Sequence, residues 1–222
     1  MSHPIDLFWS FRSPYSYLVT GRMRALAEER GVDVSLRVVL PLAIRDTTFF
    51  ERVNPLWPPY LVRDIVRVAQ FHRIPIGWPR PDPVVQTPED GRLVTAPEQP
   101  YIHRLSRLGV AAAERGRGLP FIDEVSRIIW SGEVAGWDQG DHLARATERA
   151  GLELAELDTA LEADPERFDG QIQQNQKDQL TAGHWGVPTM VYDGEPFFGQ
   201  DRFDLLVWRL EQNGLPKTGD VR

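Results

Sequence analysis

The chain has 222 residues and no cysteine, which excludes disulfides, thiolate metal sites and a redox thiol of its own. The net charge is −7 and basic residues form no cluster, so a surface that follows the phosphates of a nucleic acid is not expected. No apolar run reaches the roughly 18 residues of a membrane-spanning helix, and the start of the chain lacks the features of a secretion signal. We therefore expect a cytoplasmic protein without membrane or nucleic-acid partners.

The first 40 residues have the pattern of a β-α-β unit. Residues 5–9 alternate as in a half-buried strand, and residues 14–30 place apolar side chains on one helical face. Gly31 follows at the position that favours glycine after a helix, and residues 34–38 alternate again. A strand, a crossover helix and a second strand of this kind predict two parallel strands.

Strand signals fade from about residue 43 to residue 183, where amphipathic patterns predict a helical block. A proline-rich stretch between residues 75 and 100 predicts an irregular connection within this block. The helices are expected at residues 60–73, 101–115, 120–131, 141–150 and 169–182.

Strand signals return near the end of the chain. Residues 189–192 and 195–198 flank Asp193-Gly194, a strong signal for a two-residue hairpin turn, and a last helix is expected at 202–212. The order β-α-β, helical block, β-β-α predicts an α/β protein with a thioredoxin-like fold, in which a mixed four-stranded sheet carries a large all-helical insertion. We expect residues 1–42 and 184–222 to form the thioredoxin-like domain, and residues 43–183 to form the insertion.

The segment Ser13-Pro14-Tyr15-Ser16 lies between the first strand and the first helix. Redox members of this fold carry Cys-x-x-Cys here, because helix-end amides and the helix dipole stabilise a thiolate. A serine hydroxyl does not ionise usefully, but it can donate a hydrogen bond to a thiolate that a ligand brings. The alternative interpretation is an ordinary helix start, with Ser13 as the N-cap and Pro14 in the first turn.

Two segments near the end of the chain each have a functional and an ordinary interpretation. Pro188 enters a strand after Val187, so it can be a cis proline whose preceding residue offers its backbone to an extended peptide, or simply the first residue of a strand. Gln200 and Asp201 start the last helix, where they can hold the zwitterionic end of a ligand, or Asp201 can merely cap the helix.

Taken together, these segments resemble the glutathione transferase kappa family and its bacterial relatives, the 2-hydroxychromene-2-carboxylate isomerases, within the DsbA-like thioredoxin superfamily. The stretch from Phe11 to Leu18 is similar to the family's opening signature, and the stretches from His184 to Thr189 and from Phe197 to Arg202 are similar to its closing one. The helix start from Tyr60 to Asp64 extends the resemblance along the chain.

The resemblance implies a glutathione site, a small aromatic substrate and a homodimer. It implies that Ser13 is the catalytic residue that binds the sulfur, that Val187 pairs with the tripeptide beside Pro188, and that Gln200 and Asp201 hold the γ-glutamyl end. The implied glutathione-binding residues are Ser13, Asn54, Trp57, Val187, Pro188, Gln200 and Asp201.

One position departs from the family's pattern. Trp57 stands where the family usually has a lysine, which puts the contact to the glycyl carboxylate in question, and Arg12 or Arg63 are alternative cations. The five histidines lack metal-ligand spacing, so no metal site is expected. An aromatic-rich stretch can line an apolar substrate pocket or can pack in the core; it comprises Phe49, Phe50, Trp57 and Tyr60.

Three functional hypotheses follow. The leading one is a glutathione-dependent isomerase of an unsaturated aromatic keto acid, of the 2-hydroxychromene-2-carboxylate to hydroxybenzylidenepyruvate type, that adds the thiolate reversibly and does not consume glutathione. The second is a kappa-class transferase or peroxidase that does consume it. The third is a redox-silent thioredoxin-like binding module without enzymatic activity.

Overall fold

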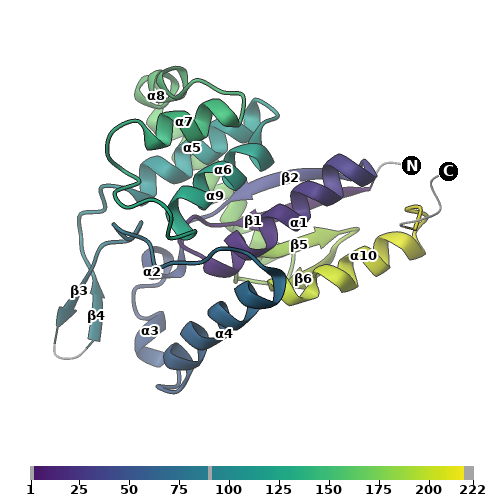
Figure 1. Cartoon of the computed structure of the whole chain (residues 1–222), viewed down its shortest axis with the longest axis horizontal. Helices are drawn as coiled ribbons and strands as arrows, with labels where there is room; N and C mark the ends of the chain where they lie inside the picture. Colours follow the sequence, from purple (N-terminus) through teal and green to yellow (C-terminus); the bar gives the residue numbers. More distant parts are fainter. Residues whose placement is uncertain (1–2, 90–91, 218–222) are drawn as a thin grey trace.

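Four strands from the two ends of the chain form one mixed sheet in the computed structural model, which describes residues 3–89 and 92–217. Their spatial order is β2-β1-β5-β6, with β1 parallel to β2 and the other neighbours antiparallel. The strands are β1 (Pro4–Trp9), β2 (Asp33–Val38), β5 (Thr189–Tyr192) and β6 (Glu195–Phe198). The mixed four-stranded sheet and the thioredoxin-like order of its elements are thereby confirmed (Figure 1).

The helices follow the predicted order, with differences of a few residues at their ends. The first helix, α1 (Pro14–Arg30), begins after Ser13 and ends at Gly31, whose φ of 65° lies in the left-handed region that suits glycine. Three helices were not predicted from the sequence: α2 (Leu42–Arg45), α3 (Phe49–Arg52) and α8 (Leu154–Ala163). The remaining helices are α4 (Trp57–His72), α5 (Ile102–Glu114), α6 (Gly118–Trp130), α7 (His142–Arg149), α9 (Pro165–Thr181), the 3-10 turn η1 (Gln200–Arg202) and α10 (Phe203–Gln212).

The prediction of an all-helical insertion is wrong in one place. Strands β3 (Gln86–Glu89) and β4 (Arg92–Thr95) form an antiparallel hairpin, which projects away from the main sheet in Figure 1. Their sequence holds β-branched residues on both sides of Asp90-Gly91, a dipeptide typical of two-residue turns, although these two residues lie outside the described ranges. The surrounding prolines obscured this signal in the sequence.

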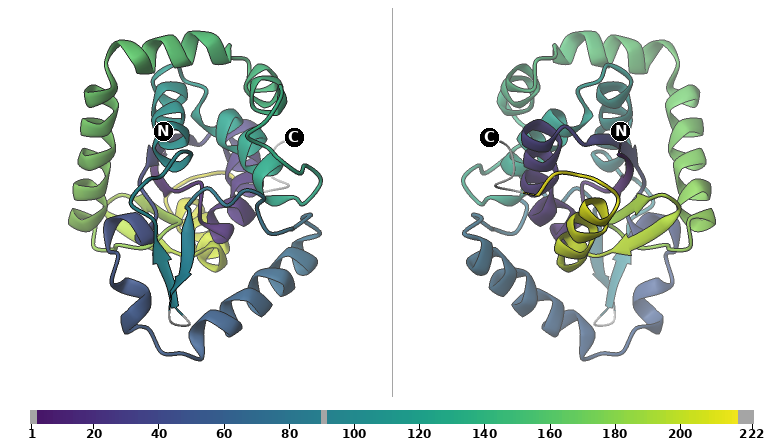
Figure 2. Two further views of the ribbon diagram at one scale, coloured as in Figure 1. Left: turned by 90° about the vertical axis from the view of Figure 1, so that its left-hand side faces the viewer. Right: turned by 90° about the vertical axis from the view of Figure 1, so that its right-hand side faces the viewer.

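The core is continuous through the sheet and the helices around it. The same cluster of buried side chains includes Leu7 and Trp9 of β1, Phe121 of α6, Phe168 of α9 and Leu206 of α10. Figure 2 shows α4 and α9 along opposite sides of the molecule, with α1 and the sheet between them. The division into residues 1–42 with 184–222 and residues 43–183 stays a prediction, because a shared core does not reveal which part folds alone. Within the described ranges, no helix combines the length and the apolarity that crossing a bilayer requires.

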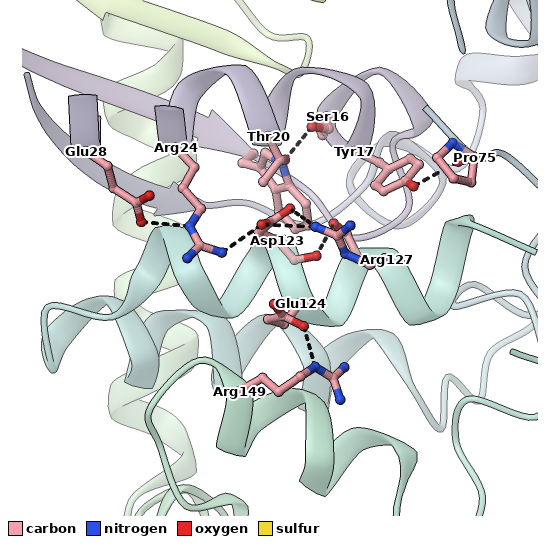
Figure 3. Close-up of polar contacts among 12 residues, drawn as sticks. Ser16, Tyr17, Thr20, Arg24, Glu28, Pro75, Asp123, Glu124, Arg127 and Arg149 are labelled. Atoms are coloured by element: carbon pink, nitrogen blue, oxygen red, sulfur yellow. Dashed lines mark hydrogen bonds and ion pairs between the residues drawn. The ribbon is translucent and has the colours of Figure 1, made fainter. Parts of the chain in front are cut away.

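A buried carboxylate fastens α1 to α6 (Figure 3). The side chain of Asp123 on α6 accepts hydrogen bonds from Arg24 of α1 (2.9 Å) and from Arg127 of α6 (3.2 Å). Two guanidinium groups compensate the charge that burial would otherwise make costly. The hydroxyl of Tyr17 donates to the carbonyl of Pro75 (2.8 Å), and α1 is thereby also tied to the proline-rich connection.

The proline-rich connection is anchored to the C-terminal end of α6 by backbone contacts. The amide of Gly77 donates to the carbonyl of Trp130 (2.6 Å), and the amide of Gly136 donates to the carbonyl of Arg80 (2.9 Å). The indole of Trp137 donates to the carbonyl of Pro81 (2.8 Å), which follows a cis peptide bond. The Trp130 indole in turn donates to the carbonyl of Phe11 (2.9 Å), just before α1. The connection is therefore held beside residues 11–13.

Candidate active site

Ser13 caps α1 and also contacts the loop that precedes β5. Its Oγ accepts a hydrogen bond from the amide of Ser16 (3.2 Å), and Pro14 follows in the first turn, so the helix-start interpretation of this segment is correct. The same hydroxyl donates to the carbonyl of Val187 at 3.4 Å. This distance is longer than usual for an O–H donor, so the hydroxyl hydrogen is held weakly and is available to a stronger acceptor.

The loop around Pro188 places one free backbone donor beside Ser13. The Val187-Pro188 peptide bond is cis, one of the two forms expected from the sequence. The Gly186 carbonyl accepts hydrogen bonds from the side chains of Gln179 (2.6 Å) and Thr189 (2.7 Å). Within residues 3–89 and 92–217, the amide of Val187 has no hydrogen-bond acceptor. This N–H can therefore pair with the carbonyl of an extended peptide.

The segment that starts the last helix, around Gln200, lies against the loop around Pro188. The amide of Gly199 donates to the carbonyl of Pro188 (2.9 Å), so the turn η1 starts beside the Val187-Pro188 bond. The side chain of Gln200 is buried and its Oε1 accepts a hydrogen bond from Arg22 of α1 (2.6 Å), which leaves the backbone amide and the side-chain Nε2 as the donors of Gln200 that can meet a ligand. Asp201 is exposed and pairs with its neighbour Arg202 (2.7 Å).

An aromatic cluster borders the loop; it comprises Phe49, Trp57, His184, Trp185 and Phe198. Phe49 contacts Trp57 edge-on (ring centroids 6.3 Å apart) and tilts against Trp185 (5.3 Å). The His184 ring stacks on Phe198 (3.9 Å) and on Trp185 (5.4 Å). Trp57, Trp185 and Phe198 each remain between 37% and 45% exposed, so the cluster offers apolar faces to a planar ligand. The side chain of Phe50 lies outside the described part of the chain.

Arg45 of α2 supplies a cation next to this cluster, and sequence reasoning missed it. Its guanidinium donates to the carbonyl of Trp185 (3.0 Å) and to Oε1 of Gln179 (3.3 Å). No carboxylate of the described residues pairs with Arg45, and its Nε is buried without a hydrogen-bond partner. Burial without a counter-charge lowers the pKa of Arg45 to about 10. An anionic group of a ligand would compensate this charge.

A sequence model described as a DSBA-like thioredoxin domain matches residues 4–211. The chain belongs to this family. It is 23% identical over 209 residues to a 2-hydroxychromene-2-carboxylate isomerase of Pseudomonas putida, with 91% of each chain covered. It is 24% identical over 226 residues to the isomerase of the same name from Pseudomonas sp. (strain C18), with 97% of this chain and 93% of the relative covered.

Solved structures agree with this assignment. The structure of a 2-hydroxychromene-2-carboxylate isomerase has a TM-score of 0.67 at 22% identity and covers 95% of both chains. The cytosolic disulfide reductase DsbM of Pseudomonas aeruginosa, solved with GSH, has a TM-score of 0.57 at 16% identity, with 94% of this chain and 99% of DsbM covered. The predicted resemblance and the DsbA-like thioredoxin fold are both confirmed.

The two cations that the sequence suggested for this DsbA-like chain have other contacts. Arg12 forms an ion pair with Asp82 and lies over the rings of Trp78 (5.1 Å) and Trp130 (5.6 Å). Arg63 is exposed on α4, where its Nε donates to the carbonyl of Pro59 (3.2 Å). Arg12 is therefore engaged in holding the proline-rich connection.

Asn54 and Tyr60 lie at the start of α4, and among the described residues Asn54 forms no hydrogen bond to the segments around Ser13, Pro188 and Gln200. The Oδ1 of Asn54 accepts a hydrogen bond from the amide of Leu56 (3.0 Å), a local turn contact. Tyr60 donates to Asp64 (3.3 Å), which also accepts the hydroxyl of Tyr15 at 2.6 Å. Burial, followed by this hydrogen bond, raises the pKa of Tyr15, so Tyr15 stays protonated and ties α4 to the first turn of α1.

Among the described residues, no group of three or more histidine, aspartate or glutamate side chains is arranged to hold a metal ion. The groups that lie around residues 184–188 are the hydroxyl of Ser13, the backbone amide of Val187, aromatic rings and the guanidinium of Arg45. Such groups suit a peptide-like thiol and an aromatic acid.

Proposed function

We propose that this chain is a glutathione-dependent isomerase of an unsaturated aromatic keto acid, of the 2-hydroxychromene-2-carboxylate to hydroxybenzylidenepyruvate type. The observation that carries the proposal is the contact between Ser13 and Val187 (3.4 Å), which brings a hydroxyl and a free amide together in a chain without cysteine. The names of its relatives in Pseudomonas support the same reaction.

The residues around Ser13 fit glutathione. The hydroxyl of Ser13 suits the sulfur, the unpaired amide of Val187 suits a peptide carbonyl, and the exposed carboxylate of Asp201 suits the ammonium of the γ-glutamyl end. When bound, glutathione supplies a thiolate that adds reversibly to a conjugated carbon, so that a double bond becomes a rotatable single bond. The roles of Asn54 and Trp57 toward the tripeptide stay predictions.

The residues of the chain then have separate tasks. Ser13 at the positive end of α1 stabilises negative charge on the sulfur, since helix-end amides and the hydroxyl favour the anion. The three exposed rings of the aromatic cluster, Trp57, Trp185 and Phe198, stack on the ring of the substrate and exclude water from it. Arg45 binds the substrate's carboxylate, because this guanidinium has no acidic partner of its own among the described side chains.

Replacing Arg45 with methionine tests whether this residue binds the substrate's carboxylate. We expect KM for the aromatic acid to rise about 10-fold, the effect of losing one charged hydrogen bond. The free energy of unfolding should change by no more than about 1 kcal/mol, because relief of the buried charge offsets the lost bonds to Trp185 and Gln179. Arg63→Met, at an exposed arginine of α4, is the matched control and should leave both quantities unchanged. An unchanged KM in Arg45→Met would remove Arg45 from the substrate site.

The stoichiometry of glutathione distinguishes the proposed activity from its rivals. With aromatic keto acid in excess, we expect many turnovers per molecule of glutathione and no loss of free thiol. One glutathione consumed per turnover would instead support the kappa-class transferase or peroxidase. No binding of glutathione at millimolar concentration would support the redox-silent binding module.

A homodimer and a cytoplasmic location also stay predictions. Two helices carry exposed apolar side chains that are the first candidates for an interface, namely Val62 and Val66 on α4 and Leu205 and Trp208 on α10. Sedimentation of the purified chain would decide whether it is a dimer.

A further inference from the structure

His184 holds the backbone on which the glutathione site is built. Its Nδ1 accepts a hydrogen bond from the amide of Gly186, two residues along the chain, at 2.9 Å. Because Nδ1 is the acceptor, the ring hydrogen lies on Nε2 and the imidazole is neutral. Burial lowers the pKa of His184, which favours the same neutral form.

Phe198 covers one face of the ring, and Trp185 lies at its side. The Phe198 centroid is 3.9 Å from that of His184 with an angle of 21° between the rings, and the Trp185 centroid is 5.4 Å away. The centroids of Phe198 and Trp185 are 6.3 Å apart, which is too close for the imidazole to lie between the two rings. There is no space for a side chain at position 186, because a Cβ on Gly186 would lie 2.4 Å from the Phe198 ring and 3.1 Å from Cε1 of His184. The imidazole therefore has one position available, and in that position it meets the Gly186 amide.

Side chains from other elements and from the loop itself hold the backbone of this loop. The Trp185 carbonyl is held by Arg45 of α2, the Gly186 carbonyl by Gln179 of α9, and the Gly186 amide by His184. The amide of Val187 follows directly and, like the amide of Trp185, has no acceptor among the described residues. Loss of the bond to His184 would leave three consecutive amides unpaired and would allow other conformations of the loop.

We propose that His184 is a positioning residue for glutathione, which keeps the Gly186-Val187 backbone in the one conformation that presents the Val187 amide beside Ser13. The inference rests on the proposed function. Its energetic basis is a population effect: if only a fraction of molecules holds the loop in the binding conformation, the apparent Kd rises by the inverse of that fraction.

Two substitutions separate the hydrogen bond from the ring stack. His184→Phe keeps an aromatic ring against Phe198 and Trp185 but removes the acceptor. His184→Asn removes the ring but places Oδ1 where it can accept the same amide, because asparagine commonly bonds the backbone N–H two residues on. We expect His184→Phe to raise both the Kd and the KM for glutathione about 5- to 10-fold with kcat unchanged, and His184→Asn to stay within about 2-fold of the wild type.

Hydrogen exchange of the backbone amides gives a readout that needs no ligand. The Gly186 amide should exchange faster in His184→Phe than in the wild type or in His184→Asn. A wild-type Kd in His184→Phe, an equal loss of affinity in both variants, or a fall in kcat without a rise in KM would overturn the inference. Failure of the wild type to bind glutathione would instead overturn the proposed function, so the two failures are distinguishable.

Discussion

Replacing Ser13 with alanine is expected to lower kcat for the aromatic keto acid about 100-fold. In the proposed mechanism the hydroxyl of Ser13 donates to the thiolate, and removal of one such donor from a developing anion typically costs this much. The pKa of the bound thiol should rise in the variant, because the charged form loses a hydrogen bond. Ultraviolet titration of the thiolate in the glutathione complexes of both proteins measures this shift.

The substitution also removes the cap of α1, so the loss of activity needs a control for the loss of stability. Asp164→Ala is matched to it, because the Asp164 side chain caps α9 by accepting a hydrogen bond from the amide of Arg167 (3.1 Å). Each substitution should cost about 1 kcal/mol of the free energy of unfolding. Only Ser13→Ala should alter kcat and the thiol pKa. A variant at Ser13 with unchanged thiol pKa would reduce this residue to a helix cap.

Replacing Gly77 with alanine is expected to be the most destabilising of the small substitutions in the chain. A Cβ on Gly77 would lie 2.5 Å from Cα and 3.0 Å from the amide nitrogen of Gly132. Both atoms belong to the backbone, so no side chain can rotate away, and the proline-rich connection would have to separate from the end of α6. We expect a loss of about 3 kcal/mol, which corresponds to a Tm lower by roughly 6–12 °C in a domain of this size.

Gly21→Ala is the matched control for this prediction. Gly21 lies inside α1, and its added Cβ would meet no atom within 4 Å. Alanine should therefore stabilise the helix by about 0.5–1 kcal/mol, since it loses less backbone entropy on folding than glycine does. Thermal unfolding followed by circular dichroism measures both variants. A Tm of Gly77→Ala within about 2 °C of the wild type would contradict the close approach of the two backbones.

Local signals predicted the elements that bear the site. The bounds of α1 agree with the sequence because Ser13, Pro14 and Gly31 act within one turn of each helix end. The terminal hairpin agrees because Asp193-Gly194 favours a tight turn whatever surrounds it. The β3–β4 hairpin was missed because the prolines near it favour an irregular chain. Its contact with the rest of the fold joins residues far apart in the sequence, since Thr95 donates to the carbonyl of Ala43 (3.1 Å).

Local sequence signals did not predict which partner each polar side chain would have. Gln200 appeared in the sequence as a residue for the ligand, yet its side chain is held by Arg22, which lies 178 positions away. The partner of Arg12 was equally unpredictable, because its ion pair with Asp82 forms only when the proline-rich connection packs beside α6.

The sequence by itself determined the thioredoxin-like order of elements, the absence of a thiol, and the helix start at Ser13, because these depend on residue types and on neighbours a few positions apart. Only the tertiary structure decided that the half-buried Arg45 has no acidic partner among the described residues, that His184 holds the amide of Gly186 while its ring packs on Phe198, and that the Val187 amide finds no acceptor in the same part of the chain. Burial and hydrogen-bond partners are properties of the packed chain, and segments more than 100 residues apart supply them here.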